Sequence, residues 1–275
     1  MKVQLTESQY NRLVEFQKRA YSFDWDDNIL NMPTQIHLEK KEKVGDEWKP
    51  EDVTTSEFAK MRHLVGTEYR LLNDNPSEAF ADFRGYDAFI SDTKKAIEDG
   101  SYGPSFDKFK EALMYGNDFS IITARGQSPK ALKDGTKVLI DMALKPKEKQ
   151  MMMDRLRGLS VDEYLSLQDY HPVSSDEFME KFGSEGGAEN PEIAKTIALR
   201  DFTSRVVNAA KELEGNPEYN GLSVGFSDDD LKNVELAKEF IGKELKNSYP
   251  NVRFLVYDTS DPKDTKKKRI VIQKS

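Results

Sequence analysis

Three short apolar runs that end in polar clusters are the feature that most limits how this chain can fold. Residues 20–24 lead into FDWDD, residues 118–123 into TAR, and residues 221–227 into DDD. Helical segments separate these runs, and apolar strands that alternate with helices indicate an α/β fold with a parallel sheet. We therefore expect a three-layer Rossmann-like architecture, in which helices cover both faces of a mostly parallel sheet.

The remaining elements are predicted from helix caps and from the spacing of apolar residues. Ser160 and Glu163 match a capping box, and Asn190 followed by Pro191 is typical of a helix start. Such signals predict helices over residues 7–18, 105–115, 146–157, 191–213 and 230–246, with two more beginning at 129 and 160. Further strands are expected near 170–173, 252–257 and 269–272.

Residues 29–104 are predicted to be an insertion in a single domain that spans residues 1–275. Within it, residues 34–58 alternate apolar and polar side chains on both sides of the turn Val44-Gly45-Asp46, which predicts a β-hairpin that acts as a flap. Residues 59–104 show weak periodicity with breaks at their prolines, so we expect a small helical, cap-like insertion there.

The composition excludes several classes of protein. The chain has no cysteine, which removes thiolate catalysis, disulfides and cysteine-ligated metals. Its 41 basic and 49 acidic residues give a net charge of −8, which disfavours a dedicated nucleic-acid coat protein. No apolar run approaches the roughly 18 residues of a membrane-spanning helix, and the first residues are polar. We expect a cytoplasmic protein with no membrane partner and no obligate protein partner.

The acidic clusters are candidates for a metal site. Ligands of open α/β sheets bind where the carboxyl ends of the strands converge, so these clusters are expected to share one crevice. Five or six carboxylates there would repel one another strongly, and a hard cation such as Mg²⁺ would relieve that repulsion. Carboxylates with Mg²⁺ indicate phosphate chemistry. Taken alone, FDWDD also fits a capped turn.

The order of these motifs resembles the haloacid dehalogenase-like superfamily over most of the chain. Its first motif, an aliphatic strand followed by Asp-x-Asp, is matched by YSFDWDDN at residues 21–28. Its second, a strand that ends in Thr or Ser, is matched by IITAR at residues 121–125. Lys195 at a helix start matches the third, with Lys211 as the alternative, and SDDDLKN at residues 227–233 matches the fourth.

The resemblance implies roles for these residues in a Mg²⁺-dependent phosphomonoesterase. Asp24 would be the nucleophile that forms an aspartyl-phosphate, and Asp26 the general acid and base. The chain must bend after Asp24 to bring both carboxyls to the phosphate, and Trp25 would lend its backbone carbonyl. The phosphate would be bound by Thr123, Ala124, Arg125 and Lys195, and the metal by Asp24, Asp26, Asp228 and Asp229.

Several alternatives stay open at this point. Either Asp228 or Asp229 would be the principal metal ligand, and Arg125 either grips the phosphate or pairs with an acid. Asp27 and Asn28 depart from the family pattern, in which a small residue such as Gly and then Thr or Val is usual.

The substrate is expected to be a phosphorylated small molecule or a nucleic-acid end. The Thr-Ala-Arg loop and the acidic pair are similar to those of the phosphatase halves of polynucleotide end-healing enzymes, which remove 3′ phosphates. The charge of −8 favours a nucleotide or another small phosphoester instead. The alternative from another class is a catalytically degenerate relative that binds ligands or acts as a scaffold without turnover.

Overall fold

A computed structural model describes residues 19–42, 47–156, 158–185, 190–213, 221–261 and 268–272. A six-stranded sheet forms its centre, with strand order β6-β5-β1-β7-β8-β9. The first five strands in this order are parallel, and β9 pairs with β8 in the antiparallel direction. These strands are β1 (Arg19–Phe23), β5 (Asp118–Thr123), β6 (Asp169–Pro172), β7 (Ser223–Asp228), β8 (Arg253–Asp258) and β9 (Lys268–Ile272).

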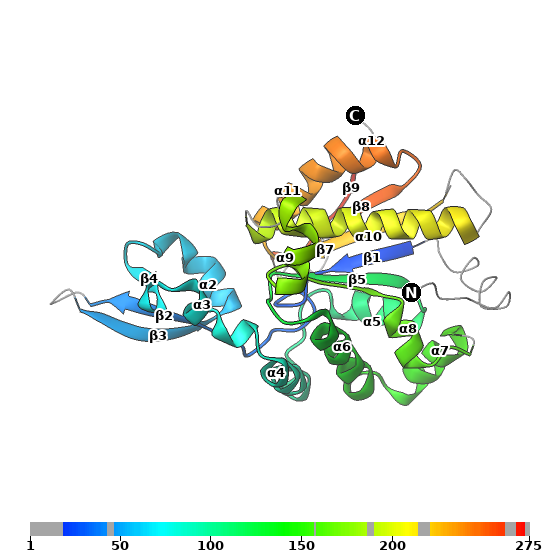
Figure 1. The fold of residues 1–275 in the computed structure, drawn as a ribbon. Helices are drawn as coiled ribbons and strands as arrows, with labels where there is room; N and C mark the ends of the chain where they lie inside the picture. Colours follow the sequence, from blue (N-terminus) through cyan, green and yellow to red (C-terminus); the bar gives the residue numbers. More distant parts are fainter. Residues whose placement is uncertain are drawn as a thin grey trace.

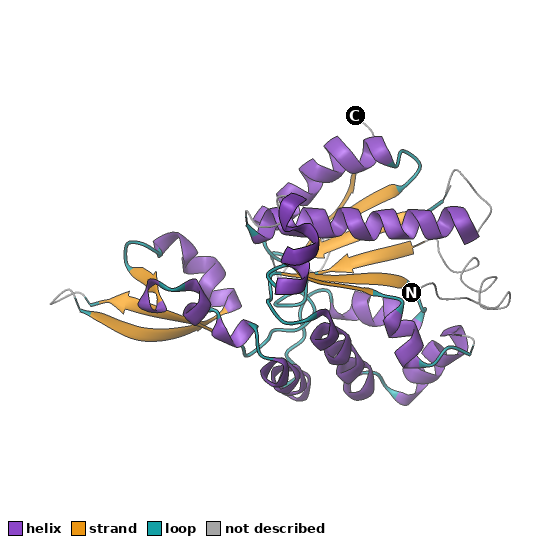
Figure 2. Cartoon of the chain, viewed as in Figure 1, coloured by secondary structure: helices purple, strands orange, loops and turns teal. Residues whose placement is uncertain are grey.

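Helices cover both faces of this sheet (Figures 1 and 2). One face carries α9 (Asp176–Phe182), α10 (Pro191–Leu213), α11 (Leu231–Phe240) and α12 (Lys246–Ser248), with a π-helical stretch, Ile241–Leu245, between the last two. The other carries α4 (Tyr86–Glu98), α5 (Phe106–Met114), α6 (Pro129–Ala143), α7 (Pro146–Leu156) and α8 (Val161–Ser166). None of the described helices has the length and apolar character needed to cross a membrane.

The insertion stands beyond the carboxyl ends of the parallel strands (Figure 1). It contains a three-stranded antiparallel sheet of order β3-β2-β4, made of β2 (Gln35–Lys41), β3 (Trp48–Thr54) and β4 (Tyr69–Leu71). Its helices are α2 (Thr55–Met61), α3 (Pro76–Ala79) and the 3₁₀ turns Arg62–Leu64, Leu72–Asp74 and Ala81–Phe83. These elements enclose a small apolar core of their own, which includes Ile36, Leu38 and Phe83.

The mixed α/β class and the predominantly parallel central sheet agree with the prediction. The insertion differs from it, because β4 adds a strand to the hairpin where we expected only helices. β4 has only three residues, too few to show the alternation of apolar and polar side chains that predicts a strand. It is defined by its pairing with β2. The predicted helix over 7–18 and the turn Val44-Gly45-Asp46 lie outside the described residues.

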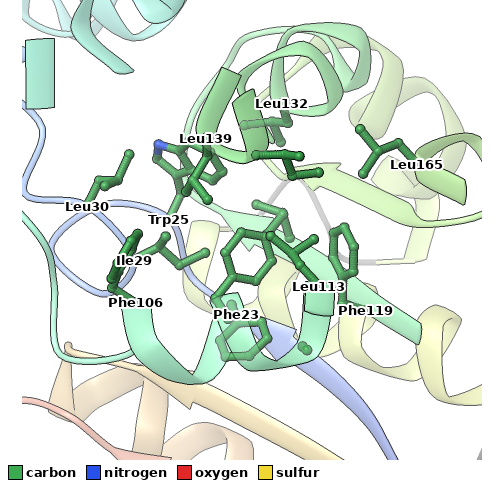
Figure 3. Packing of buried hydrophobic residues seen from close by; sticks show 14 of the residues in the cluster. Phe23, Trp25, Ile29, Leu30, Phe106, Leu113, Phe119, Leu132, Leu139 and Leu165 are labelled. Carbon is green, nitrogen blue, oxygen red and sulfur yellow. The ribbon is translucent and has the colours of Figure 1, made fainter. Parts of the chain in front are cut away.

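The core between β1 and the helices α4, α5 and α6 is rich in aromatic rings (Figure 3). Phe23 meets Phe109 edge to face, with ring centroids 5.2 Å apart, and Trp25 lies 5.4 Å from Phe89. Gly135 of α6 lets Phe89 pack against the helix backbone, since a Cβ at position 135 would lie 2.6 Å from Cε1 of that ring. Close approach of α4 to α6 therefore depends on the absence of a side chain at this position.

We predict that Gly135→Ala lowers the free energy of unfolding by about 1–3 kcal/mol, because overpacking outweighs the better helix propensity of alanine. The matched control is Gly242→Ala, where an added Cβ would meet nothing within 4 Å. This control is expected to be neutral or to stabilise by up to about 1 kcal/mol. Urea denaturation measures both, and equal effects of the two substitutions would contradict the packing described here.

Candidate metal and phosphate site

Three of the sequence motifs meet at the carboxyl edge of the central sheet. In the register of the sheet, Phe23 at the end of β1 pairs with Ile121 of β5 on one side and with Ser227 of β7 on the other. Asp24 follows directly, and its backbone N–H donates to the Ser227 carbonyl at 3.0 Å. The strands thus bring Asp24, the end of β5 and the acidic cluster after β7 to one place.

The chain bends after Asp24, as predicted. The carbonyl of Trp25 accepts hydrogen bonds from the backbone N–H groups of Ile29 at 3.0 Å and Leu30 at 3.2 Å, which closes a tight turn. Trp25 is fully buried among the aromatic rings, while Asp24 and Asp26 both line a cavity. The Trp25 carbonyl is therefore occupied within the turn, contrary to the expectation that it would be lent to the site.

Asp24, Asp228 and Asp229 form a compact acidic group. Each offers one carboxylate oxygen, and these three oxygens lie within 4.8 Å of one another. Oδ1 of Asp24 is buried and has no hydrogen-bond partner among the described residues. A buried carboxylate oxygen without a donor is costly, so a cation bound there would replace the missing partner. The oxygen-only donor set fits a hard divalent cation such as Mg²⁺.

Lys195, in the first turns of α10, supplies the positive charge within this group. Its Nζ lies 2.8 Å from Oδ2 of Asp228 and 3.2 Å from Oδ2 of Asp24, and the residue is only 5% exposed. Burial opposes the charge, but Asp228 and Asp24 outweigh it and raise the pKa of Lys195. Lys195 rather than Lys211 therefore lies in the site.

One lysine does not balance three carboxylates. Burial, together with the charges of Asp228 and Asp26, raises the pKa of Asp24 well above its usual range, although Lys195 acts in the opposite direction. The pKa of Asp229 is raised as well, first by burial and then by Asp228. Burial first, and the neighbouring carboxylates second, thus disfavour the charged forms of both groups, and protons or a bound cation can offset this cost.

Within the cluster after β7, the three aspartates have different surroundings. Asp228 is fully buried, and its carboxylate accepts from the Asn233 amide at 3.0 and 3.2 Å and from the backbone N–H of Asp230 at 2.9 Å. Asp229 lines the cavity. Asp230 caps α11 and receives two hydrogen bonds from Arg62 of the insertion, at 2.7 and 3.2 Å. Asp230 thus joins the insertion to the sheet and is not part of the acidic group.

The carboxylate of Asp26 lies outside the acidic group, and its role as a fourth metal ligand stays a prediction. Both its oxygens accept hydrogen bonds from Arg125, at 2.7 and 2.6 Å, and Thr123 donates to it at 3.4 Å. Arg125 is 1% exposed, also donates to Thr34 at 2.8 Å, and lies over the ring of Phe83. Two roles were considered for Arg125, binding of the phosphate and pairing with an acid. In this structure Arg125 pairs with an acid, Asp26.

Asn28 is a positioning residue that the sequence motifs did not reveal. Its Nδ2 donates to the carbonyls of Asp24 and Ser227 at 3.1 Å each. Its Oδ1 accepts from the hydroxyls of Ser227 at 3.1 Å and Thr259 at 2.9 Å. This fully buried amide ties together the ends of three neighbouring strands. The sequence departs from the family pattern at Asn28, but three of its four hydrogen bonds are to Ser227 and Thr259, which lie far along the chain.

Asp27 adopts a backbone conformation that usually favours glycine. Its φ is 54°, in the left-handed region. Burial is the main cause that raises the pKa of the Asp27 carboxyl to about 6, and Asp26 adds to the shift. The turn therefore presents a further acid to the cavity at a cost in backbone strain.

A cavity of about 440 Å³ opens from these residues toward the insertion. The side formed by the central sheet is lined by Asp24, Asp229 and Lys195. Thr123 and the exposed Ala124 also line this side. Phe58 and Phe80 are among the insertion residues on the other side. The volume lies within the usual range for sites that bind small molecules.

The structure brings most of the predicted site residues into one place. Those that line the cavity are Asp24, Asp26, Thr123, Ala124, Arg125, Lys195 and Asp229, and Asp228 lies directly beneath them as the partner of Lys195. No family model, curated protein or solved structure matches this chain.

We predict that Asn28→Ala lowers the free energy of unfolding by about 3 kcal/mol or more, because it leaves several buried donors and acceptors without partners. The matched control is Asn31→Ala. The Asn31 amide is exposed and makes one hydrogen bond, to the Tyr102 carbonyl at 3.3 Å, so its loss is expected to cost less than about 0.5 kcal/mol. Chemical denaturation measures the free energy of unfolding of both variants. An equal loss of stability in the two would show that the hydrogen bonds of Asn28 do not stabilise the fold.

Proposed function

We propose that this chain is a Mg²⁺-dependent phosphomonoester hydrolase that forms a covalent aspartyl-phosphate on Asp24. The observation that carries the proposal is the buried, unpartnered Oδ1 of Asp24 beside Lys195, at the head of a ligand-sized cavity. Its substrate would be a nucleotide, a 3′-phosphorylated nucleic-acid end or another small phosphoester. Asp24, Asp228 and Asp229 would hold the cation.

The first step would be attack by the Asp24 carboxylate on phosphorus. The bond from phosphorus to the leaving oxygen breaks, and that oxygen takes a proton from the Asp26 carboxyl, which lines the same cavity. The resulting Asp26 carboxylate is the form that Arg125 and Thr123 bind in this structure. Arg125 would thus stabilise the product side of the proton transfer.

The second step would reverse the roles of Asp26. Its carboxylate accepts a proton from a water molecule, whose oxygen attacks phosphorus, and the bond to Asp24 breaks to release inorganic phosphate. Lys195 offsets the charge of Asp24 and of the phosphoryl group through both steps. A bound divalent cation supplies further electrostatic stabilisation of the phosphoryl oxygens. The haloacid dehalogenase-like superfamily is the family to which this reaction would assign the chain.

One observation favours the alternative of a binding protein without turnover. Both oxygens of Asp26 are already engaged by a buried arginine, so proton donation requires that at least one of these hydrogen bonds be exchanged for one to the substrate. A protein that retained this pair unchanged would bind a cation and a phosphate but would release no product.

We predict that the protein releases phosphate from p-nitrophenyl phosphate only when Mg²⁺ is present, and that Asp24→Asn lowers kcat by at least about a thousandfold. The matched control is Asp258→Asn at the end of the neighbouring strand β8, whose carboxylate bonds to Ser260 and does not line the cavity. This control should retain kcat within about twofold.

A second readout separates the two candidate functions. A hydroxylamine-sensitive phosphoryl adduct on Asp24, identified by mass spectrometry after a rapid quench, is expected for the hydrolase. Tight Mg²⁺ binding without phosphate release would favour the binding protein. Equal phosphate release by the native protein and Asp24→Asn would overturn the hydrolase assignment.

A further inference from the structure

Part of the cavity wall formed by the insertion is apolar and aromatic. Ile36, Phe58, Phe80 and Phe83 line it, opposite the carboxylates and Lys195. Phe58 and Phe80 meet edge to face with centroids 5.8 Å apart, and Phe80 meets Phe83 in the same way at 6.0 Å. Phe58 and Phe80 are only partly buried, so their rings retain contact area for a ligand. Aromatic rings arranged in this way favour a flat apolar partner.

Three of the four basic side chains that line the cavity are paired with carboxylates. Arg62 is paired with Asp230, Arg125 with Asp26, and Lys195 with Asp24 and Asp228. Arg84 is the exception. Within the described part of the chain, no carboxylate and no hydrogen-bond acceptor contacts its guanidinium, although it borders the cavity. An arginine that faces a ligand cavity without a partner is suited to bind an anionic group of the ligand.

Arg84 is held beside the cavity by its backbone and by its stem. The backbone N–H of Gly126 donates to the Phe83 carbonyl at 3.0 Å, and the guanidinium of Arg125 lies 4.8 Å from the centre of the Phe83 ring. A Cβ at Gly126 would lie 3.3 Å from Cγ of Arg84 and 3.2 Å from the Ser174 carbonyl oxygen. Glycine at position 126 therefore lets the arginine stem lie close to the loop that follows β5.

We propose that the cavity selects phosphomonoesters whose leaving group carries a flat apolar ring and a second anionic group. The phosphate lies at Asp24 and Lys195, the ring lies against Phe58 and Phe80, and the second anion is bound by Arg84. This inference rests on the proposed function, since it names the class of substrate for the same site. Arg84 and Phe80 are specificity-determining residues in this account and take no part in the transfer of the phosphoryl group.

Three synthetic esters test the two subsites separately. Ethyl phosphate, benzyl phosphate and 4-carboxybenzyl phosphate all release an alkoxide-type oxygen, so their intrinsic reactivities are similar. We expect kcat/KM to rise about tenfold from the ethyl to the benzyl ester, from contact of the ring with Phe58 and Phe80. A further rise of about fivefold is expected for the carboxybenzyl ester, as for a partly exposed ion pair.

Two variants assign these gains to residues. Arg84→Met should abolish the preference for the carboxyl group and leave the ratio of benzyl to ethyl ester unchanged. Phe80→Leu should reduce the ratio of benzyl to ethyl ester. The control for net charge is Arg253→Met, which removes an exposed arginine from β8, outside the cavity, and should alter neither ratio. Equal kcat/KM for the three esters, or a carboxyl preference that survives Arg84→Met, would overturn the proposal.

A binding measurement keeps this test independent of catalysis. Benzylphosphonate and 4-carboxybenzylphosphonate cannot be hydrolysed at the carbon–phosphorus bond, and their affinities in the presence of Mg²⁺ can be compared by calorimetry. An affinity ratio of about fivefold that is lost in Arg84→Met supports the subsite even if no ester is hydrolysed, in which case the hydrolase assignment alone would fail. Hydrolysis of all esters together with equal phosphonate affinities would remove the subsite and leave the hydrolase intact.

Discussion

The repulsion among three carboxylates that share one ammonium group is the interaction on which the rest of the site depends. Asp24, Asp228 and Asp229 present oxygens within 4.8 Å of one another, with Lys195 as the cation between two of them. At this separation and in a partly buried place, each uncompensated pair costs on the order of several kcal/mol. These three carboxylates therefore favour the binding of an additional cation. The proposed chemistry depends on that cation.

The fold keeps these charges together through contacts that are not themselves charged. β1 lies in the middle of the parallel strands, so Asp24 is flanked by the ends of β5 and β7. The Asn28 amide joins the ends of β1, β7 and the segment after β8. The N-terminal part of α10 then brings Lys195 over the edge of the sheet. Packing and hydrogen bonding elsewhere in the domain offset the electrostatic repulsion among these carboxylates.

The features that could be predicted from sequence are those with local causes. The strand over 118–123 and the capping box of Ser160 and Glu163 follow from neighbouring residues, and the structure has both. The convergence of the acidic clusters followed from a general property of parallel sheets, that their carboxyl ends share one edge. Lys195, at the start of a long helix, was named as the cation of the site only from the resemblance of the motifs, with Lys211 as the alternative.

The features that were missed depend on partners far apart in the chain. Nothing near Asp26 in sequence shows that Arg125 will contact both its carboxylate oxygens, which places this carboxylate outside the acidic group. The strand β4 is defined by pairing with β2 across the insertion. The unpaired Arg84 and the aromatic wall become visible only when the insertion is placed against the sheet. Tertiary contacts determine such features, and local propensity does not predict them.

The claim that a divalent cation occupies the acidic group is tested most directly by anomalous diffraction from crystals equilibrated with Mn²⁺, which has oxygen-ligand preferences similar to those of Mg²⁺. The account predicts one strong peak bounded by carboxylate oxygens of Asp24, Asp228 and Asp229, with the Arg125–Asp26 pair away from it. A saturating concentration of Mn²⁺ that leaves no peak there, or a peak that is instead coordinated by Asp26, would contradict it.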